Sequence, residues 1–116
     1  MKQNILVTGG SGFIGSAIVK YLVNLNHNVI VYDNNSRGKL RRLKKIQKKI
    51  KFIKGDIRDK KKIFSINNKI DTVIHLAYVN GTKFFYNKPF EVLDIAVNGL
   101  LNILNFSKKK KIKNFF

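Results

Sequence analysis

The sequence of 116 residues predicts an α/β protein with a doubly wound, parallel sheet. Two observations lead to this prediction. Strand-like and helix-like segments alternate along the whole chain, which is typical of folds with helices on both faces of a sheet. The strand-like segments are almost continuously apolar, as expected of parallel strands buried on both faces. Because crossovers between parallel strands are right-handed, the expected strand order is 3-2-1-4-5.

The N-terminal half predicts three strands and two helices. Short apolar runs next to turn residues indicate strands at Asn4–Thr8, Asn28–Tyr32 and Ile50–Ile53. Apolar residues at helical spacing predict a helix over Phe13–Leu25. The very basic stretch Arg37–Lys49 predicts a short helix on the outside of the molecule.

The C-terminal half continues the alternation. We expect a short helix at Lys60–Ile66, a strand at Thr72–Leu76 and an aromatic-rich loop over residues 78–88. Pro89 suits the first position of a helix, where its missing N–H has no partner. That helix runs to about Lys108, in a lysine run that suits the negative end of its dipole. Ile112–Phe116 begins a fifth strand, so we expect one domain over the whole chain, truncated at this strand.

The composition limits the possible classes of function. The chain has no cysteine, which excludes disulfides and thiolate ligands and fits a reducing cytoplasm. No apolar run approaches a signal peptide or a membrane span, so we expect a cytoplasmic protein without a membrane partner. No cluster of His, Asp or Glu has metal-ligand spacing, so no metal is expected. The net charge of +18 suggests nucleic-acid binding as a function. However, nearly all the excess charge comes from lysines in segments that a fold would expose. We therefore expect a solvated basic surface and no specific nucleic acid.

A glycine motif between the first strand and the first helix carries the strongest functional signal. We expect Gly9 to allow a tight turn, Gly12 to let the backbone approach a pyrophosphate, and Gly15 to let the helix pack closely. The helix N-terminus then offers N–H groups and a positive dipole end to phosphates. The strand before the motif and the helix after it favour dinucleotide binding over a tight turn without a ligand.

Two carboxylates follow the next strands. Asp33 ends the second strand, 18 residues past Gly15, where a carboxylate accepts hydrogen bonds from the adenosine ribose hydroxyls. Its charge repels a 2′-phosphate and favours NAD over NADP, a preference that the nearby Arg37 would soften. Asp56 follows the third strand; the residues alone leave it open between a ligand-binding carboxylate and a cap for the helix near Asp59. A turn or capping role is the alternative for Asp33 as well.

Six segments together resemble the extended short-chain dehydrogenase/reductase family: TGGSGFIGS, VIVYDNNSRG, FIKGDIRD, IDTVIHLA, NKPFEVLDIAVNGLLNIL and IKNFF. Within this family, the sequence is most similar to the NAD-dependent epimerases/dehydratases of nucleotide sugars, of the UDP-glucose 4-epimerase type, over essentially its whole length. The resemblance implies a Rossmann-type NAD-binding domain. In the complete enzyme it implies hydride transfer between a sugar hydroxyl carbon and NAD.

The resemblance also implies roles for individual residues. Phe13 and Ile14 would supply backbone N–H groups, Asp56 would bind the adenine amino group with Ile57 on the ring, and Lys88 would reach the cofactor phosphates. The implied cofactor-binding residues are Gly9, Gly12, Phe13, Ile14 and Gly15 in the pyrophosphate loop; Asp33, Asn35, Ser36, Arg37, Asp56 and Ile57 on the adenosine side; Leu76, Ala77 and Tyr78 towards the nicotinamide; and Lys88.

Three departures from the family pattern stand out. Tyr78 occupies a position where the family usually has a small residue, and Ala96 replaces an asparagine common in the sugar 4-epimerases; Asn98 is not its equivalent. The third departure concerns the family's catalytic residues, a Ser/Thr and a Tyr-x-x-x-Lys pair in which the tyrosine is the acid/base. Neither has a counterpart in this sequence, and no tyrosine is followed four residues later by lysine. We therefore assign no catalytic residue and expect this chain alone not to turn over a sugar nucleotide.

Other candidates favour structural roles. His27 and His75 are expected to be packed or surface residues rather than ligands. The aromatic run Phe84 to Tyr86 is expected to be buried against the helix that starts at Pro89 rather than to form a stacking surface. That helix has apolar residues on more than one face, and in the resembled family it helps to build a dimer, so a homodimer or a complementing C-terminal chain is a possible partner.

The main hypothesis is therefore the NAD-binding part of a nucleotide-sugar epimerase or dehydratase. The alternatives are a non-catalytic NAD-binding module or subunit and, less favoured, a basic nucleic-acid-binding protein.

Overall fold

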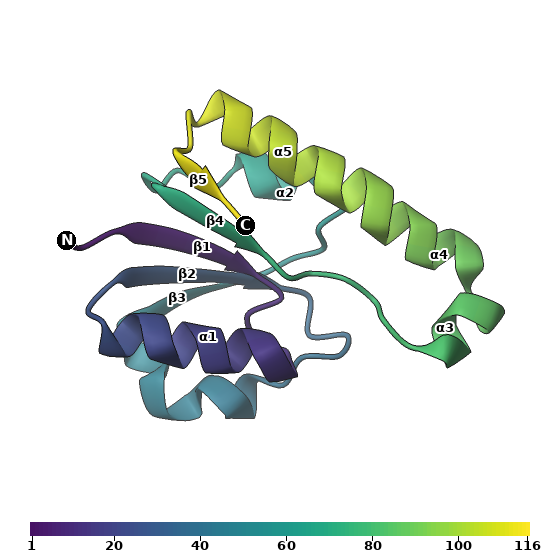
Figure 1. Cartoon of the computed structure of the whole chain (residues 1–116), viewed down its shortest axis with the longest axis horizontal. Coiled ribbons are helices and arrows are strands. Elements are labelled where there is room, and N and C mark those ends of the chain that lie inside the picture. Colours follow the sequence, from purple (N-terminus) through teal and green to yellow (C-terminus); the bar gives the residue numbers. More distant parts are fainter.

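The computed structural model describes residues 1–116 and contains one five-stranded sheet. The strand order is β3-β2-β1-β4-β5, and every pair of neighbours is parallel. This confirms the predicted order and the doubly wound α/β class (Figure 1). Since all strands point the same way, their carboxyl ends meet at one edge of the sheet, where ligands bind in open α/β folds.

The N-terminal elements lie close to their predicted positions. They are β1 (Asn4–Thr8), α1 (Phe13–Asn24), β2 (Asn28–Asp33), the 3₁₀-helical segment η1 (Leu40–Lys49) and β3 (Ile50–Lys54). Asp33 is therefore the last residue of a strand and is held by the sheet.

The segment η1 differs from the expected helix over Arg37–Lys49 in its start and its geometry. Residues 34–38 form a loop instead. Leu40, Leu43 and Ile46 recur every third residue, which matches the three residues per turn of a 3₁₀ helix. This spacing directs Leu43, which is fully buried, and Ile46 towards the core and leaves the lysines in solvent.

The next elements are α2 (Lys60–Phe64), β4 (Thr72–His75) and α3 (Thr82–Asn87). The expectation of a loop throughout residues 78–88 is wrong, since α3 forms one and a half turns within it. Gly81, with φ +133°, precedes this short helix, and Lys88 separates it from the next one. The aromatic residues of α3 thus lie on a helix, well away from the sheet (Figure 1).

The helix predicted over Pro89–Lys108 forms as one rod with a wide turn inside it. It consists of α4 (Pro89–Asp94), the π-helical turn η2 (Ile95–Gly99) and α5 (Leu100–Lys109). The last element, β5 (Asn114–Phe115), pairs with β4. No helix of the structure has the length and apolar character that a membrane crossing requires.

The core consists of two layers, one on each face of the sheet. Alternate strand residues point to opposite faces: Ile5 and Val7 face α1 and η1, whereas Leu6 faces α2 and α5. Figure 1 shows α1 on one side of the sheet and α2 with the long α4–α5 rod on the other. Both layers fix the strand ends that bear the polar residues described next.

Candidate functional site

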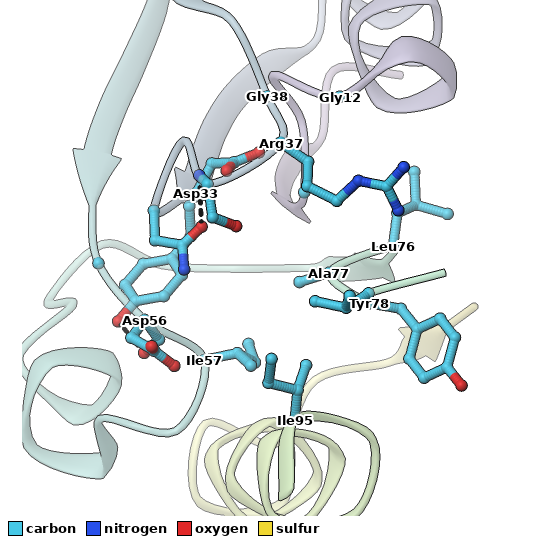
Figure 2. Close-up of a pocket in the computed structure, with 16 residues that line it drawn as sticks. Gly12, Asp33, Arg37, Gly38, Asp56, Ile57, Leu76, Ala77, Tyr78 and Ile95 are labelled. Atoms are coloured by element: carbon cyan, nitrogen blue, oxygen red, sulfur yellow. Dashed lines mark hydrogen bonds between the residues drawn. The ribbon is translucent and has the colours of Figure 1, made fainter. Parts of the chain in front are cut away.

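A pocket lies at the carboxyl ends of β1, β2, β3 and β4. In Figure 2, Gly12, Arg37 and Gly38 lie on one side of it and Ile57 and Ile95 on the other. The lining residues are Gly9, Gly12, Tyr32, Asp33, Asn34, Ser36, Arg37, Gly38, Gly55, Asp56, Ile57, Leu76, Ala77, Tyr78, Val79 and Ile95. Most residues singled out from the sequence are among them, and the exceptions are Phe13, Ile14, Gly15, Asn35 and Lys88.

The glycine loop has the backbone geometry that the motif predicts. Gly9 has φ +72°, and a Cβ there would lie 2.8 Å from the carbonyl carbon of Leu76. A Cβ on Gly15 would lie 2.1 Å from the Gly9 carbonyl oxygen, so only glycine lets the first turn of α1 pack on the loop. A Cβ on Gly12 would meet only that same oxygen, at 3.1 Å. The loop is therefore tight at its two ends and open to the pocket in its middle.

The N-terminus of α1 offers backbone donors to this open side. The first helical hydrogen bond runs from the Ser16 N–H to the Gly12 carbonyl, at 2.9 Å. The N–H groups of Phe13, Ile14 and Gly15 precede that bond, and no side chain caps the helix. Phe13 and Ile14 do not line the pocket and have exposed side chains. The role expected for their backbone N–H groups stays a prediction.

Asp33 is the buried carboxylate of the pocket, with 8% of its surface exposed. Its Oδ2 accepts the N–H of Ser11 at 3.0 Å, and its Oδ1 accepts the N–H of Asn35 at 2.8 Å. Each carboxylate oxygen has two lone pairs, so both retain capacity for a further donor such as a hydroxyl. Asp33 thus joins the glycine loop to the loop after β2 and still presents a negative charge to the pocket.

Ser11 explains why residues 34–38 form a loop rather than the start of η1. It is fully buried, its hydroxyl donates to Asn35 Oδ1 at 2.8 Å, and its carbonyl accepts the N–H of Lys39 at 3.0 Å. A Cβ on Gly38 would lie 1.9 Å from the Ser11 hydroxyl oxygen, so the chain passes here only as glycine. Asn35 therefore holds the loop in place from outside the pocket, and neither Ser11 nor Gly38 was singled out from the sequence.

Asp56 is held by an arginine two residues later. Its Oδ1 accepts the backbone N–H and Nε of Arg58 at 2.8 and 3.0 Å, and its Oδ2 accepts Nη2 at 2.8 Å. Nη1 of Arg58 bonds Asp94 at 3.2 Å, which ties this loop to α4. The hydrogen bonds from Arg58 hold the pKa of Asp56 below its usual range. The helix cap is Asp59, which accepts the N–H of Lys62 at 3.0 Å, so Asp56 is not the cap.

Tyr32 forms part of the pocket lining and was not predicted from the sequence. It is 1% exposed, and its hydroxyl donates to the Asp56 carbonyl at 2.7 Å. Burial, with the charges of Asp59 and Asp56, raises the pKa of Tyr32 far above its usual value, so it stays a neutral donor. A Cβ on Gly55 would lie 2.4 Å from that hydroxyl, which makes a glycine necessary beside the ring.

A buried hydroxyl fixes the end of β4. Thr8 Oγ1 accepts the N–H groups of Leu76 and Ala77, both at 3.1 Å, and lies 2.7 Å from Nδ1 of His75. Since both lone pairs of the hydroxyl are used, its hydrogen points to His75, whose Nδ1 must be the unprotonated acceptor. Burial lowers the pKa of His75, in agreement with a neutral ring. His75 is therefore a packed residue, as expected, and His27 likewise accepts a backbone N–H, that of Gln3.

The opposite end of the pocket is formed by residues after β4 and by η2. Ile95 enters the lining from the π-helical turn, and a Cβ on Gly99 would lie 2.5 Å from Ile57 Cγ2. Ala96 and Tyr78, two positions that depart from the family pattern, share a mostly apolar hollow next to this end. The π-helical turn η2 thus lies where the α4–α5 rod meets the pocket, at Ile95 and Gly99. No local sequence signal predicted this turn.

Lys88 lies outside the pocket lining, and its expected role stays a prediction, whereas the aromatic residues of α3 differ from expectation. Lys88 is exposed outside the pocket and pairs with Glu91 at 3.7 Å. The expectation that the aromatic run is buried against the Pro89 helix is wrong: Phe85 and Tyr86 are 42% and 81% exposed, and only Phe84 is half-buried. The short helix α3 lies at the end of the α4–α5 rod, away from the sheet, so the sheet does not cover its rings (Figure 1).

Comparison with known sequences identifies related proteins. The sequence model of the NAD dependent epimerase/dehydratase family matches residues 5–116. A UDP-N-acetyl-alpha-D-glucosaminuronate decarboxylase from Bacillus cytotoxicus is 36% identical over 116 residues, which are all of this chain and 36% of that protein. A UDP-glucose 4-epimerase from Klebsiella pneumoniae is 36% identical over 97% of this chain and 86% of its own length.

Solved structures have the same fold. A UDP-glucose 4-epimerase from Thermotoga maritima, crystallised with UDP-glucose, is 33% identical with a TM-score of 0.90. The enzyme of that name from Thermus thermophilus, in complex with NAD, is 30% identical with a TM-score of 0.88. Each match covers 97% of this chain and 36% of the other, so the chain spans about a third of the length of these proteins.

Proposed function

Because this chain belongs to the NAD dependent epimerase/dehydratase family, we propose that its pocket binds NAD as the cofactor part of a nucleotide-sugar enzyme.

One arrangement carries the proposal. A glycine loop that opens α1 and a buried carboxylate at the end of the neighbouring strand face one pocket, and Ser11 joins them through its N–H bond to Asp33. The loop offers backbone donors and a positive dipole end, which suit a diphosphate. The carboxylate at the end of β2 offers acceptors, which suit ribose hydroxyls. Together the two features fit a dinucleotide better than a single phosphate or a sugar alone.

The remaining lining residues support this orientation of the cofactor. Asp56 and Ile57, after β3, would take the adenine, and Ala77 and Tyr78, after β4, would lie towards the nicotinamide. Bound NAD would supply an acceptor for a hydride from the sugar carbon that bears the hydroxyl. The contact of Lys88 with the phosphates remains a prediction, since Lys88 is not among the lining residues.

We also propose a nucleotide sugar as the substrate class. The support comes from the related proteins, whose names specify UDP-sugar 4-epimerisation and UDP-sugar acid decarboxylation. This chain spans only a third of most of them, so the reaction and the sugar are proposals about the whole protein. The pocket residues themselves bear on cofactor binding alone.

Calorimetric titration of the 116-residue chain with NAD tests the cofactor site. Asp33→Asn removes the charge and one acceptor oxygen, and hydrogen bonds to charged groups are each worth about 1.5–3 kcal/mol. We therefore expect the dissociation constant to rise by about 10-fold or more.

The matched control is Asp59→Asn, the same change at an exposed helix cap outside the pocket. Asparagine caps helices about as well as aspartate, so this variant should bind NAD like the unaltered chain. The proposal fails if the unaltered chain does not bind NAD, or if both variants bind it equally well.

For the partner, we propose a second copy of this chain packed on the outer face of the α4–α5 rod. Six large apolar side chains on this rod, Leu101 among them, are exposed although the helix is packed on the sheet by its other face. The other five recur at spacings of three and four residues, the pattern by which two helices pack together: Phe90, Leu93, Val97, Leu100 and Leu104. A self-complementary stripe of this kind suits a two-fold dimer.

Sedimentation equilibrium tests the dimer. Leu93→Lys with Leu104→Lys should convert a dimer into a monomer, whereas Leu40→Lys, at an equally exposed leucine on η1, should leave it unchanged. A monomeric unaltered chain would refute the self-association and favour a different chain or segment as the cover of this face.

A further inference from the structure

Arg37 spans the mouth of the pocket and joins two loops that belong to different strands. It lies in the loop after β2 and lines the pocket. Its Nη1 donates to the carbonyl of Asn80, and its Cζ lies 5.3 Å from the centre of the Phe84 ring. Asn80 and Phe84 belong to the segment after β4, on the far side of the opening. Figure 2 shows the side chain extending from the Gly38 side of the pocket towards Leu76, away from Asp33.

The guanidinium is therefore not paired with the carboxylates of the site. Asp33 receives its two hydrogen bonds from the backbone of Ser11 and Asn35, and Asp56 receives its guanidinium from Arg58. None of the three ion pairs in the structure includes Arg37. Although Arg37 is only four residues after Asp33, its guanidinium does not pair with the Asp33 carboxylate.

This placement matters for the choice between the two nicotinamide dinucleotides. A carboxylate at the end of the second strand binds the ribose hydroxyls and repels a 2′-phosphate, whereas a nearby arginine accommodates the phosphate. Both residue types are present here, so selectivity depends on where the guanidinium is held. We propose that Phe84 is a specificity-determining residue: its ring holds Arg37 across the pocket, away from the adenosine ribose, and thereby maintains a preference for NAD over NADP.

The inference rests on the proposed function, because it requires a dinucleotide in the pocket. Phe84 rather than Asn80 is the side chain to change, since Asn80 contributes only its backbone carbonyl. Phe84 is also distinct from the next residue of α3: it is half-buried under the guanidinium, whereas Phe85 is 42% exposed and contacts no cation. Phe85 therefore offers a matched control on the same helix.

The size of the effect is limited by the strength with which the ring holds the arginine. A cation–π contact at an exposed site corresponds to roughly a two- to fivefold change in an equilibrium constant. Releasing Arg37 should therefore tighten NADP binding by about that factor, because a guanidinium forms strong, paired hydrogen bonds with a phosphate. Binding of NAD, which has no 2′-phosphate, should change less.

The experiment measures dissociation constants for NAD and NADP by calorimetry in six forms of the chain. Four are the unaltered chain, Phe84→Leu, Phe84→Tyr and Phe85→Leu. The other two are Arg37→Gln alone and Arg37→Gln combined with Phe84→Leu. We expect Phe84→Leu to reduce the ratio of NADP to NAD dissociation constants two- to fivefold. Phe84→Tyr keeps the ring and should keep the ratio, as should Phe85→Leu. In the Arg37→Gln background, Phe84→Leu should have no effect.

The outcomes separate this inference from the proposed function. If neither dinucleotide binds the unaltered chain, the proposed function fails. If NAD binds but Phe84→Leu leaves the ratio unchanged, or alters it equally without Arg37, the specificity role of Phe84 is overturned. Circular dichroism of each variant shows whether it is folded. If Phe84→Leu does not fold, Phe84→Tyr still tests the inference, because a loss of selectivity in the tyrosine variant would contradict it.

Discussion

Acid should weaken the folded state through His75, the buried histidine bonded to Thr8. In the fold, its Nδ1 accepts the Thr8 hydroxyl at 2.7 Å, and burial lowers its pKa below the usual value of 6.5. The unfolded chain exposes the ring and takes up a proton near that usual value. Between the two pKa values the unfolded state therefore binds more protons, so the stability falls as the pH is lowered from 6.5 towards the pKa in the fold.

The magnitude follows from the linkage between protonation and folding. At about one pH unit below the unfolded pKa, a histidine that stays neutral in the fold reduces the free energy of unfolding by at most about 1.4 kcal/mol. Protonation in the fold would place an N–H of His75 against the Thr8 hydroxyl, whose two lone pairs already accept the N–H groups of Leu76 and Ala77. The effect therefore reports on the network that positions two pocket residues.

Urea unfolding followed by circular dichroism at about pH 8 and about pH 5.5 measures the effect, with His75→Gln as the reference. Glutamine can accept the Thr8 hydroxyl but does not titrate in this range. We expect the unaltered chain to lose about 1 kcal/mol more than the variant on acidification. An equal loss in both proteins would show that His75 is not held neutral, and the assigned direction of the Thr8 hydrogen bond would be wrong.

Two further substitutions test the local geometry. Gly15→Ala places a Cβ 2.1 Å from the backbone oxygen of Gly9, and since rotation of a side chain cannot relieve this contact, we expect a loss of about 3 kcal/mol or more in the free energy of unfolding by urea. Ala17→Ser, at an exposed position of the same helix, should stay within about 0.5 kcal/mol, and similar losses for the two would refute the close packing. Asp59→Ala should reduce the free energy of unfolding by about 1 kcal/mol, because alanine removes the acceptor for the N–H of Lys62. Asp59→Asn keeps an acceptor and should cost much less. Equal thermal midpoints for the two variants would refute the cap.

The sheet and half of the site could be predicted because their signals are local. Short, mostly apolar segments predict the strands, and the glycine motif and Asp33 lie at fixed places relative to β1 and β2. The triplet spacing of Leu40, Leu43 and Ile46 was also a local signal, and it would have predicted η1 had the period of three been considered beside that of the α-helix.

The parts that were missed depend on contacts between distant residues. The ion pair of Arg58 with Asp94 joins positions 36 residues apart, and the charges alone do not specify which of many basic residues pairs with which acid. The need for glycine at position 38 arises only because Ser11 lies beneath it. Likewise, the π-helical turn IAVNG lies where Gly99 approaches Ile57, a residue 42 positions earlier in the chain.

The most direct test of the account is an NMR titration of the ¹⁵N-labelled chain with NAD, since the central claim is that the α1 N-terminus and Asp33 bind one dinucleotide together. The account predicts saturable shifts of the amide signals of Gly12 to Gly15 and of Ser11, whose N–H bonds to Asp33, with one common dissociation constant. Signals that remain unchanged there, or that shift only at the lysine-rich surface of η1, would contradict it.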